Sequence, residues 1–276
     1  MRSTISRLTP AMLMLCGTGT ALAQGLPASQ PGFITIYREY VKTGRAAEHA
    51  TIEAGWPAAF ATANSPTTYL ALTSMTGGSE VWFLVPSASY AAMEADSKRN
   101  AANPALTAEL DRLSRADAET LDQVRTMLLR ARPDLSMGAF PNLAKVRYYE
   151  VTTFRVRLGQ QQAFEAASKT WMASATRNNP SAAYRTYELV AGGPTPTYMV
   201  FTSSESYAAF DPMMAMGDKI WAGMTTDELA VMQNAVAGIA NMQSDHFRVD
   251  ATMSYVDKAT KDQDPTFWLP KKVGEQ

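Results

Sequence analysis

Apolar residues recur along the chain at two spacings, which predict alternating strands and helices. Two runs rich in β-branched and aromatic residues, 33–41 and 148–156, are typical of β-strands. A helix is predicted after each run, over about 45–63 and 160–178, because apolar residues in the second return every three or four positions. Pro57 falls inside the first helix and should kink or interrupt it.

Each helix is followed by two strands joined by a glycine turn, which is a β-hairpin signal. A second helical region and a short last strand then close each half of the chain. In the first half these are strands 67–73 and 80–85, a helical region opened by Ser87 that continues through 105–132, and strand 135–137. In the second half they are strands 183–190 and 197–202, a helical region opened by Ser203 that continues through 219–242 and includes a capping box at Thr225 and Glu228, and strand 247–255.

The same order of elements appears twice at a nearly constant offset. Gly44 and Gly159 lie 115 positions apart (159 − 44 = 115). Three further pairs have this separation: Trp56 and Trp171, Tyr69 and Tyr184, and Gly78 and Gly193. The run SYAAM at 89–93 returns as SYAAF at 206–210, now 117 positions on (206 − 89 = 117), with the extra residues in a Gly/Pro turn. We predict two copies, at 31–140 and 141–256.

The order strand–helix–strand–strand–helix–strand is that of the split βαβ, or ferredoxin-like, unit. Such a unit leaves one apolar sheet face uncovered, and a tandem copy is the nearest partner for it. The predicted fold class is therefore α+β, with two tandem ferredoxin-like repeats packed sheet to sheet as an intramolecular pseudo-dimeric α/β barrel. A monomer is expected, because the copies cover each other. The tail, 257–276, carries the apolar cluster 267–269, which either covers an edge or is disordered.

Composition excludes several classes of protein. The chain has 276 residues, 46% of them hydrophobic, and Lys+Arg 25 against Asp+Glu 26, which is ordinary for a globular protein and unlike a disordered, collagenous or coiled-coil chain. Without a basic excess, no nucleic-acid partner is expected.

The first 23 residues have the pattern of a secretory signal peptide. Arg2 and Arg7 precede the apolar core 11–16, and Ala21-Leu22-Ala23 is a small-x-small cleavage site. We expect cleavage near Ala23, a periplasmic or secreted protein, and no membrane association afterwards. A lipoprotein modified at Cys16 and an uncleaved anchor are the alternatives. The only cysteine lies in this segment, so the mature chain has no disulfide and no thiolate ligand.

In element order and repeat the chain resembles the dimeric α/β-barrel (ferredoxin-like) superfamily in its fused tandem form. NIPSNAP-like and antibiotic-biosynthesis-monooxygenase-like proteins are the nearest patterns. The resemblance implies a barrel between two sheets and, in each half, a cleft between sheet and helices. Members include cofactor-free oxygenases, isomerases, haem enzymes and proteins without known activity, so the fold selects no function.

His49 and His246 are the only histidines. His49, Glu53 and Trp56 are spaced four and three residues apart and so share one helix face. An imidazole beside a carboxylate suits general acid–base catalysis, which makes His49 and Glu53 the candidate catalytic residues. They could also hold a metal, but the sequence shows no third ligand, so no metal and no cofactor are expected. The structural alternative is a half-buried His49 bonded to Glu53 or backbone.

The repeat offset places Phe164 where the first copy has His49. We therefore expect a polar cleft in the first copy and a filled one in the second, lined by Phe164, Ser168 and Trp171. The candidate ligand-binding residues are Trp56, Tyr69, Trp171 and Tyr184.

Two functions remain open. The first is an exported module that binds a small, largely apolar or aromatic ligand or serves as a structural or assembly partner. The alternative is a cofactor-independent monooxygenase- or isomerase-like enzyme with its site in the first cleft. No nucleophile elbow, phosphate-binding loop or dinucleotide fingerprint occurs in the chain.

Overall fold

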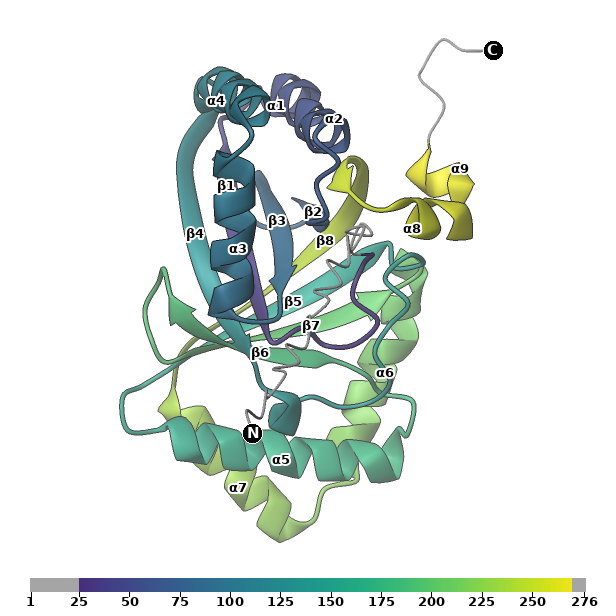
Figure 1. Ribbon diagram of the computed structural model, residues 1–276. Helices are drawn as coiled ribbons and strands as arrows, with labels where there is room; N and C mark the ends of the chain where they lie inside the picture. The colour runs from purple at the N-terminus through teal and green to yellow at the C-terminus, as the bar shows by residue number, and fades with distance from the viewer. Residues whose placement is uncertain (1–24, 270–276) are drawn as a thin grey trace, which may run out of the picture.

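Eight antiparallel strands close into a barrel in the computed structural model, which describes residues 25–269 (Figure 1). The strands are β1 (Phe33–Val41), β2 (Tyr69–Ser74), β3 (Glu80–Ser87), β4 (Leu121–Ala131), β5 (Tyr148–Val156), β6 (Arg185–Ala191), β7 (Thr197–Ser204) and β8 (Ile239–Tyr255). Around the barrel they run β1-β3-β2-β8-β5-β7-β6-β4. The predicted signal peptide lies outside the described residues.

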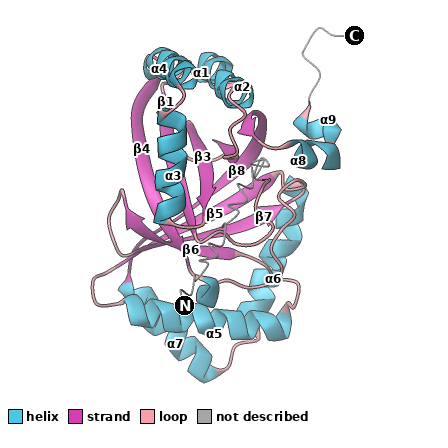
Figure 2. Cartoon of the chain, viewed as in Figure 1, coloured by secondary structure: helices cyan, strands magenta, loops and turns pink. Residues whose placement is uncertain are grey.

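Helices cover the outside of the barrel at opposite ends (Figure 2). They are α1 (Ala46–Glu53), α2 (Gly55–Thr62), α3 (Tyr90–Ala101), α4 (Pro104–Ala118), α5 (Gln161–Asn178), α6 (Phe210–Ala222), α7 (Thr226–Gly238), α8 (Lys258–Gln263) and α9 (Pro265–Trp268), with short 3₁₀ turns at Pro133–Leu135 and Tyr207–Ala209. Helices α1, α2 and α4 gather at one end of the molecule, and α5 and α7 lie at the other. Over the described residues, no helix has both the length and the apolar character needed to cross a bilayer.

The barrel interior is one apolar core. Side chains alternate along each strand, so Ile34 and Ile36 of β1 point inward and the residues between them point out. Two seams close the core, where β2 pairs with β8 and β4 pairs with β6. Leu72 and Leu129, one at each seam, have no exposed surface. The core therefore contains side chains from both halves of the chain.

Several predicted elements match the structure. Strands 33–41 and 148–156 are β1 and β5, and both hairpins form. The helix predicted near 45–63 is broken, but at Ala54 between α1 and α2. Pro57 lies in the first turn of α2, where a proline is tolerated because it lacks only an N–H that has no helical acceptor.

The helices predicted at 105–132 and 219–242 are wrong at their C-terminal ends. Helix α4 ends at Ala118 and α7 at Gly238, and the chain then enters β4 and β8. Both stretches are rich in residues with good helix propensity, but pairing with β1 and β5 outweighs that local preference. The strand predicted at 135–137 is also wrong, since only Met137 makes a β-bridge, to Tyr184.

The C-terminal segment that the structure describes packs onto the barrel. Trp268, at the end of α9, is 3% exposed and belongs to the barrel core, and its indole N–H donates to the Ala144 carbonyl at 2.9 Å. Of the two possibilities left open for the tail, cover of the barrel is the one observed.

Replacing Trp268 with alanine should therefore lower the free energy of unfolding by about 3–5 kcal/mol, because a large buried ring is lost. Leu269 is the matched control, since it is 57% exposed and Leu269→Ala should cost less than about 0.5 kcal/mol. Urea denaturation of both variants measures the difference. Equal effects would show that α9 does not pack on the barrel in solution.

Candidate functional site

Four ionisable side chains converge beneath α1 on the helix-facing side of the first four strands. Glu39 comes from β1, His49 and Glu53 from α1, and Asp117 from α4. One nitrogen or oxygen of each lies within 4.8 Å of those of the other three. The exposed fractions of His49, Glu53 and Asp117 are 1%, 3% and 4%, so the cluster is removed from bulk water. We call these four residues the acidic–histidine cluster.

Local structure explains how distant residues meet. Side chains alternate between the two faces of a strand, so Glu39 points to the same side as Val41, which packs against the helices. Ile36 points to the other side, into the barrel. His49 and Glu53 are four residues apart, so they lie on one face of α1. Asp117 is in the last turn of α4, which packs against α1.

Asp117 fixes the orientation of the imidazole. Its Oδ1 lies 2.8 Å from His49 Nδ1 and also accepts the Thr120 hydroxyl at 2.9 Å. A carboxylate accepts hydrogen bonds, so Nδ1 carries the proton and Nε2 has a free lone pair. Nε2 lies 3.6 Å from Glu39 Oε2, which is too long for a hydrogen bond. The reactive nitrogen of His49 therefore faces the carboxyl groups unpaired.

The cluster contains acidic groups without a compensating cation. Among the described residues, no lysine or arginine forms an ion pair with Glu39, Glu53 or Asp117. Burial, together with the charge of Asp117, raises the pKa of Glu39 to about 8. Burial raises the pKa of Glu53 to about 9, and the charges of Glu39 and Asp117 add to this.

Unpartnered polar atoms concentrate at the same place. Seven buried side-chain atoms of the described residues find no hydrogen-bond partner, and all seven belong to residues between 39 and 73. They are Glu39 Oε2, His49 Nε2, Glu53 Oε1, Trp56 Nε1, Thr67 Oγ1, Tyr69 OH and Thr73 Oγ1. Folded proteins pair nearly all buried polar groups, so such a concentration indicates a place for a ligand.

A cavity of about 570 Å³ borders this cluster. It lies between α1, the β2–β3 hairpin and β8, and its lining includes His49 and Thr73, with Arg248 and Asp250 among its charged groups. Of the four cluster residues, His49 is the one that lines this cavity.

The structure brings together four of the residues singled out in the sequence. Trp56 and Tyr69 lie on either side of Phe60, with ring centroids 6.4 and 5.9 Å from it, and both have an unpartnered polar atom as His49 and Glu53 do. Trp171 and Tyr184 lie in the second half instead. Trp171 packs edge-on against Trp221, and Tyr184 pairs with Met137.

The corresponding region of the second half is filled with aromatic rings. Phe164 stacks on Tyr198 at 4.5 Å and lies 5.3 Å from Phe154. These residues form a small core with Leu135 and Val156. The described residues hold no second cluster of metal-ligand type there.

Sequence reasoning missed Glu39 and Asp117. The 115-residue offset pairs Glu39 with Phe154 (39 + 115 = 154), the same exchange of a polar residue for phenylalanine that marks His49. That comparison would have found Glu39. No such signal marks Asp117, which fell inside a helix predicted to continue to residue 132. The sequence thus offered two candidate metal ligands, and the structure offers four.

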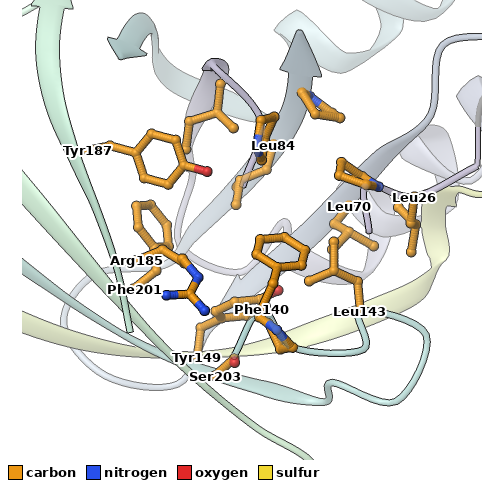
Figure 3. A pocket seen from close by; sticks show the side chains of 15 residues that line it. Leu26, Leu70, Leu84, Phe140, Leu143, Tyr149, Arg185, Tyr187, Phe201 and Ser203 are labelled. Carbon is orange, nitrogen blue, oxygen red and sulfur yellow. The ribbon is translucent and has the colours of Figure 1, made fainter. Parts of the chain in front are cut away.

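A second, apolar cavity lies at a barrel end (Figure 3). Leu70, Leu84, Leu143 and Phe201 are among its lining residues, and Arg185 is the charged one. The Arg185 guanidinium donates to the carbonyls of Met137, Tyr184 and Gly138.

Comparisons with known proteins identify the fold and leave the family open. No protein-family model matches the chain, and no curated protein matches it. Among solved structures it is similar to an anthrone oxidase-like protein, with 15% identity over 81% of this chain and 93% of the other and a TM-score of 0.55. Candidate monooxygenases of Fusobacterium nucleatum (9% identity, 80% and 93% covered, TM-score 0.53) and Lactobacillus acidophilus (9%, 83% and 97%, 0.50) are also similar. The shared feature is the ferredoxin-like α/β architecture.

The raised pKa of Glu53 makes stability depend on pH. Its carboxyl ionises near pH 4.5 in the unfolded chain and near 9 in the folded one. The stability that comes from keeping it neutral is complete below pH 4.5 and is lost as the pH rises toward 9. In metal-free buffer at pH 9, Glu53→Gln should therefore melt at least ~3 °C above the wild type, and the gap should narrow toward pH 5.

Glu48→Gln, an exposed position on the same helix, is the control and should show no such pH-dependent gap. Thermal melts by circular dichroism from pH 5 to 9 make the measurement. Parallel curves for the wild type and Glu53→Gln would contradict the raised pKa.

Proposed function

We propose that the chain is an oxygen-using enzyme of the monooxygenase or oxidase kind, with its reactive centre at the acidic–histidine cluster. The observation that carries this proposal is the concentration of unpartnered buried polar atoms beside a cavity of about 570 Å³. An arrangement of this kind is costly for folding and is typical of sites that act on a ligand.

A small aromatic compound with an acidic C–H bond is the substrate class that the residues suit best. His49 Nε2 has a free lone pair, and Asp117 stabilises the imidazolium that forms when it takes a proton. Removal of the proton leaves a carbanion that O₂ oxidises directly.

Anthrone is the appropriate probe, because one neighbour of the same fold is named anthrone oxidase-like. The reaction balances without an external reductant: anthrone and O₂ give anthraquinone and water, and the methylene carbon supplies the four electrons. The neighbours support the fold, and the support for chemistry comes from the cluster itself.

We also propose that the two halves arose by duplication and form a pseudo-dimer within one chain. Strand order supports this, since residues 31–140 run β4-β1-β3-β2 and residues 141–256 run β8-β5-β7-β6. Register supports it too: Phe33 pairs with Ser87 and Tyr148 with Ser204, and these partners differ by 115 (148 − 33) and 117 (204 − 87), the offsets of the sequence repeat. Export after signal cleavage and a monomeric state remain part of the proposal.

Purified protein should consume O₂ and form anthraquinone when given anthrone, and His49→Ala should lower kcat at least ~100-fold because its base is lost. His246→Ala is the control, since His246 lies on β8 and bonds the Tyr207 hydroxyl away from the cluster. An oxygen electrode and absorbance of the quinone follow the reaction. Equal rates in the wild type, His49→Ala and protein-free buffer, across anthrone and related hydroxyaromatic ketones, would reject the proposal.

A second candidate function is storage or transport of a small apolar ligand, favoured by the apolar cavity in Figure 3. Its lining is almost wholly apolar, which suits a hydrocarbon guest, but its volume of about 70 Å³ requires the lining side chains to move apart for a larger one. This function needs no reaction at the acidic–histidine cluster.

The neutral fluorophore N-phenyl-1-naphthylamine is larger than this cavity of about 70 Å³, so it should gain fluorescence only where the lining side chains move apart to admit it. Leu143 is a partly buried lining residue, so Leu143→Trp should fill the space and weaken binding about 10-fold or more, whereas Leu143→Ala should retain it. A fluorescence titration of the three proteins compares the affinities. Unchanged affinity in Leu143→Trp would place the dye elsewhere.

A further inference from the structure

We propose that the acidic–histidine cluster binds one divalent first-row transition-metal ion through Glu39 Oε2, His49 Nε2 and Glu53 Oε1, with Asp117 as the residue that orients His49. This inference goes beyond the function proposed above, because an ion on His49 Nε2 takes the place of the free base used there. The binding of the ion itself depends only on the geometry.

The three proposed ligand atoms are buried and have no partner in the protein. His49 and Glu53 are 99% and 97% buried by their exposed fractions of 1% and 3%, and both present an unpaired atom to the cluster. These atoms are one imidazole nitrogen and two carboxylate oxygens, the donor types that divalent metals such as Zn²⁺, Fe²⁺ and Mn²⁺ take in proteins.

The spacing of the atoms fits an ion at their centre. Metal–ligand bonds of this kind are about 2.0–2.2 Å, so ligands on opposite sides of an ion are about 4.2 Å apart. One candidate ligand atom from each of the four cluster residues lies within 4.8 Å of the others, and Glu39 Oε2 and His49 Nε2 are 3.6 Å apart, so an ion between them needs only small side-chain movements. Side-chain rotation of two glutamates can supply a movement of that size.

Asp117 has the place of a supporting residue. Its Oδ1 already accepts hydrogen bonds from His49 Nδ1 at 2.8 Å and from the Thr120 hydroxyl at 2.9 Å. A carboxylate bonded to the far nitrogen of a metal-binding histidine fixes the tautomer and increases the basicity of the ligating nitrogen. The same bond leaves Nε2, and only Nε2, as the ligating atom of His49.

Charge balance also favours a divalent ion. Glu39 and Glu53 have no lysine or arginine partner among the described residues, and a 2+ ion compensates two buried carboxylates. Three protein ligands leave coordination positions open, as in catalytic metal sites. The cavity of about 570 Å³ borders His49, and of the surrounding spaces it is the nearest source of water, O₂ or a substrate for those positions.

The test uses the full chain after removal of bound metal with a chelator, titrated with Zn²⁺ and Co²⁺. Calorimetry should show one strong site per chain, and Co²⁺ should give visible absorption bands of a protein-bound ion. Glu53→Gln and His49→Ala should each weaken binding at least ~100-fold and remove the Co²⁺ bands, and Asp117→Asn should weaken it about 10–100-fold. Glu48→Gln should bind as the wild type does.

Glu53→Gln keeps the shape of the side chain, and circular dichroism checks that it is folded. Absence of a strong site in folded wild-type protein would overturn the inference, as would affinities in Glu53→Gln and His49→Ala equal to that of Glu48→Gln. The outcome for catalysis is separate. Tight metal binding without anthrone turnover would support the metal site and reject the oxygenase. Anthrone turnover by chelator-treated protein that has no metal affinity would support the oxygenase and reject the metal site.

Discussion

Closure of the barrel at its two seams is the constraint on which the rest of the structure depends. Pairing of β2 with β8 and of β4 with β6 leaves no edge of the eight strands free. One side of each strand then faces an interior that excludes water. The inward positions of β1 are then fixed by Ile34 and Ile36, and Glu39 must face the helices. A slip of one residue in this register would turn Glu39 into the barrel and dismantle the cluster.

The two halves use equivalent positions in opposite ways. In the second half, Phe154, Phe164 and Tyr198 pack as rings, which stabilises that helix on its sheet. In the first half, the space under α1 holds acidic groups whose burial is unfavourable without a compensating charge. The second half shows that aromatic side chains such as Phe164 can fill the space between helix and sheet and stabilise the fold. The polar side chains under α1 therefore have an energetic cost that the rings of the second half avoid.

Much of the fold could be predicted because it follows from local pattern. Strand β1 is rich in β-branched and aromatic residues, and the apolar residues of helix α5 recur every three or four positions. The capping box at Thr225 and Glu228 marks the start of α7. Strands β4 and β8 could not be placed in full, since their leucine, methionine, alanine and arginine residues suit a helix until a distant strand pairs with them.

The site residues also divide into those that a local pattern predicts and those that it does not. His49 and Glu53 are visible from their four-residue spacing on α1, whereas Asp117 lies 68 residues from His49 along the chain and meets it only through packing of α4 against α1. The raised pKa of Glu39 arises from burial and from the charge of Asp117, and that of Glu53 from burial and from the charges of Glu39 and Asp117, which no local pattern contains. Chemistry that depends on contacts between elements is therefore the part that sequence reasoning could not reach.

The acid–base and metal interpretations of the cluster share one physical requirement. Glu39 and Glu53 cannot both be buried and charged unless positive charge lies between them. Over residues 25–269 no lysine or arginine pairs with either carboxyl group, and the imidazole of His49 is already bonded to Asp117. Protons on the carboxyls satisfy the requirement and leave His49 Nε2 free as a base. A divalent ion satisfies it by occupying Nε2 together with both carboxylates. Because the two states compete for the same three atoms, the occupant of the cluster decides which chemistry His49 performs.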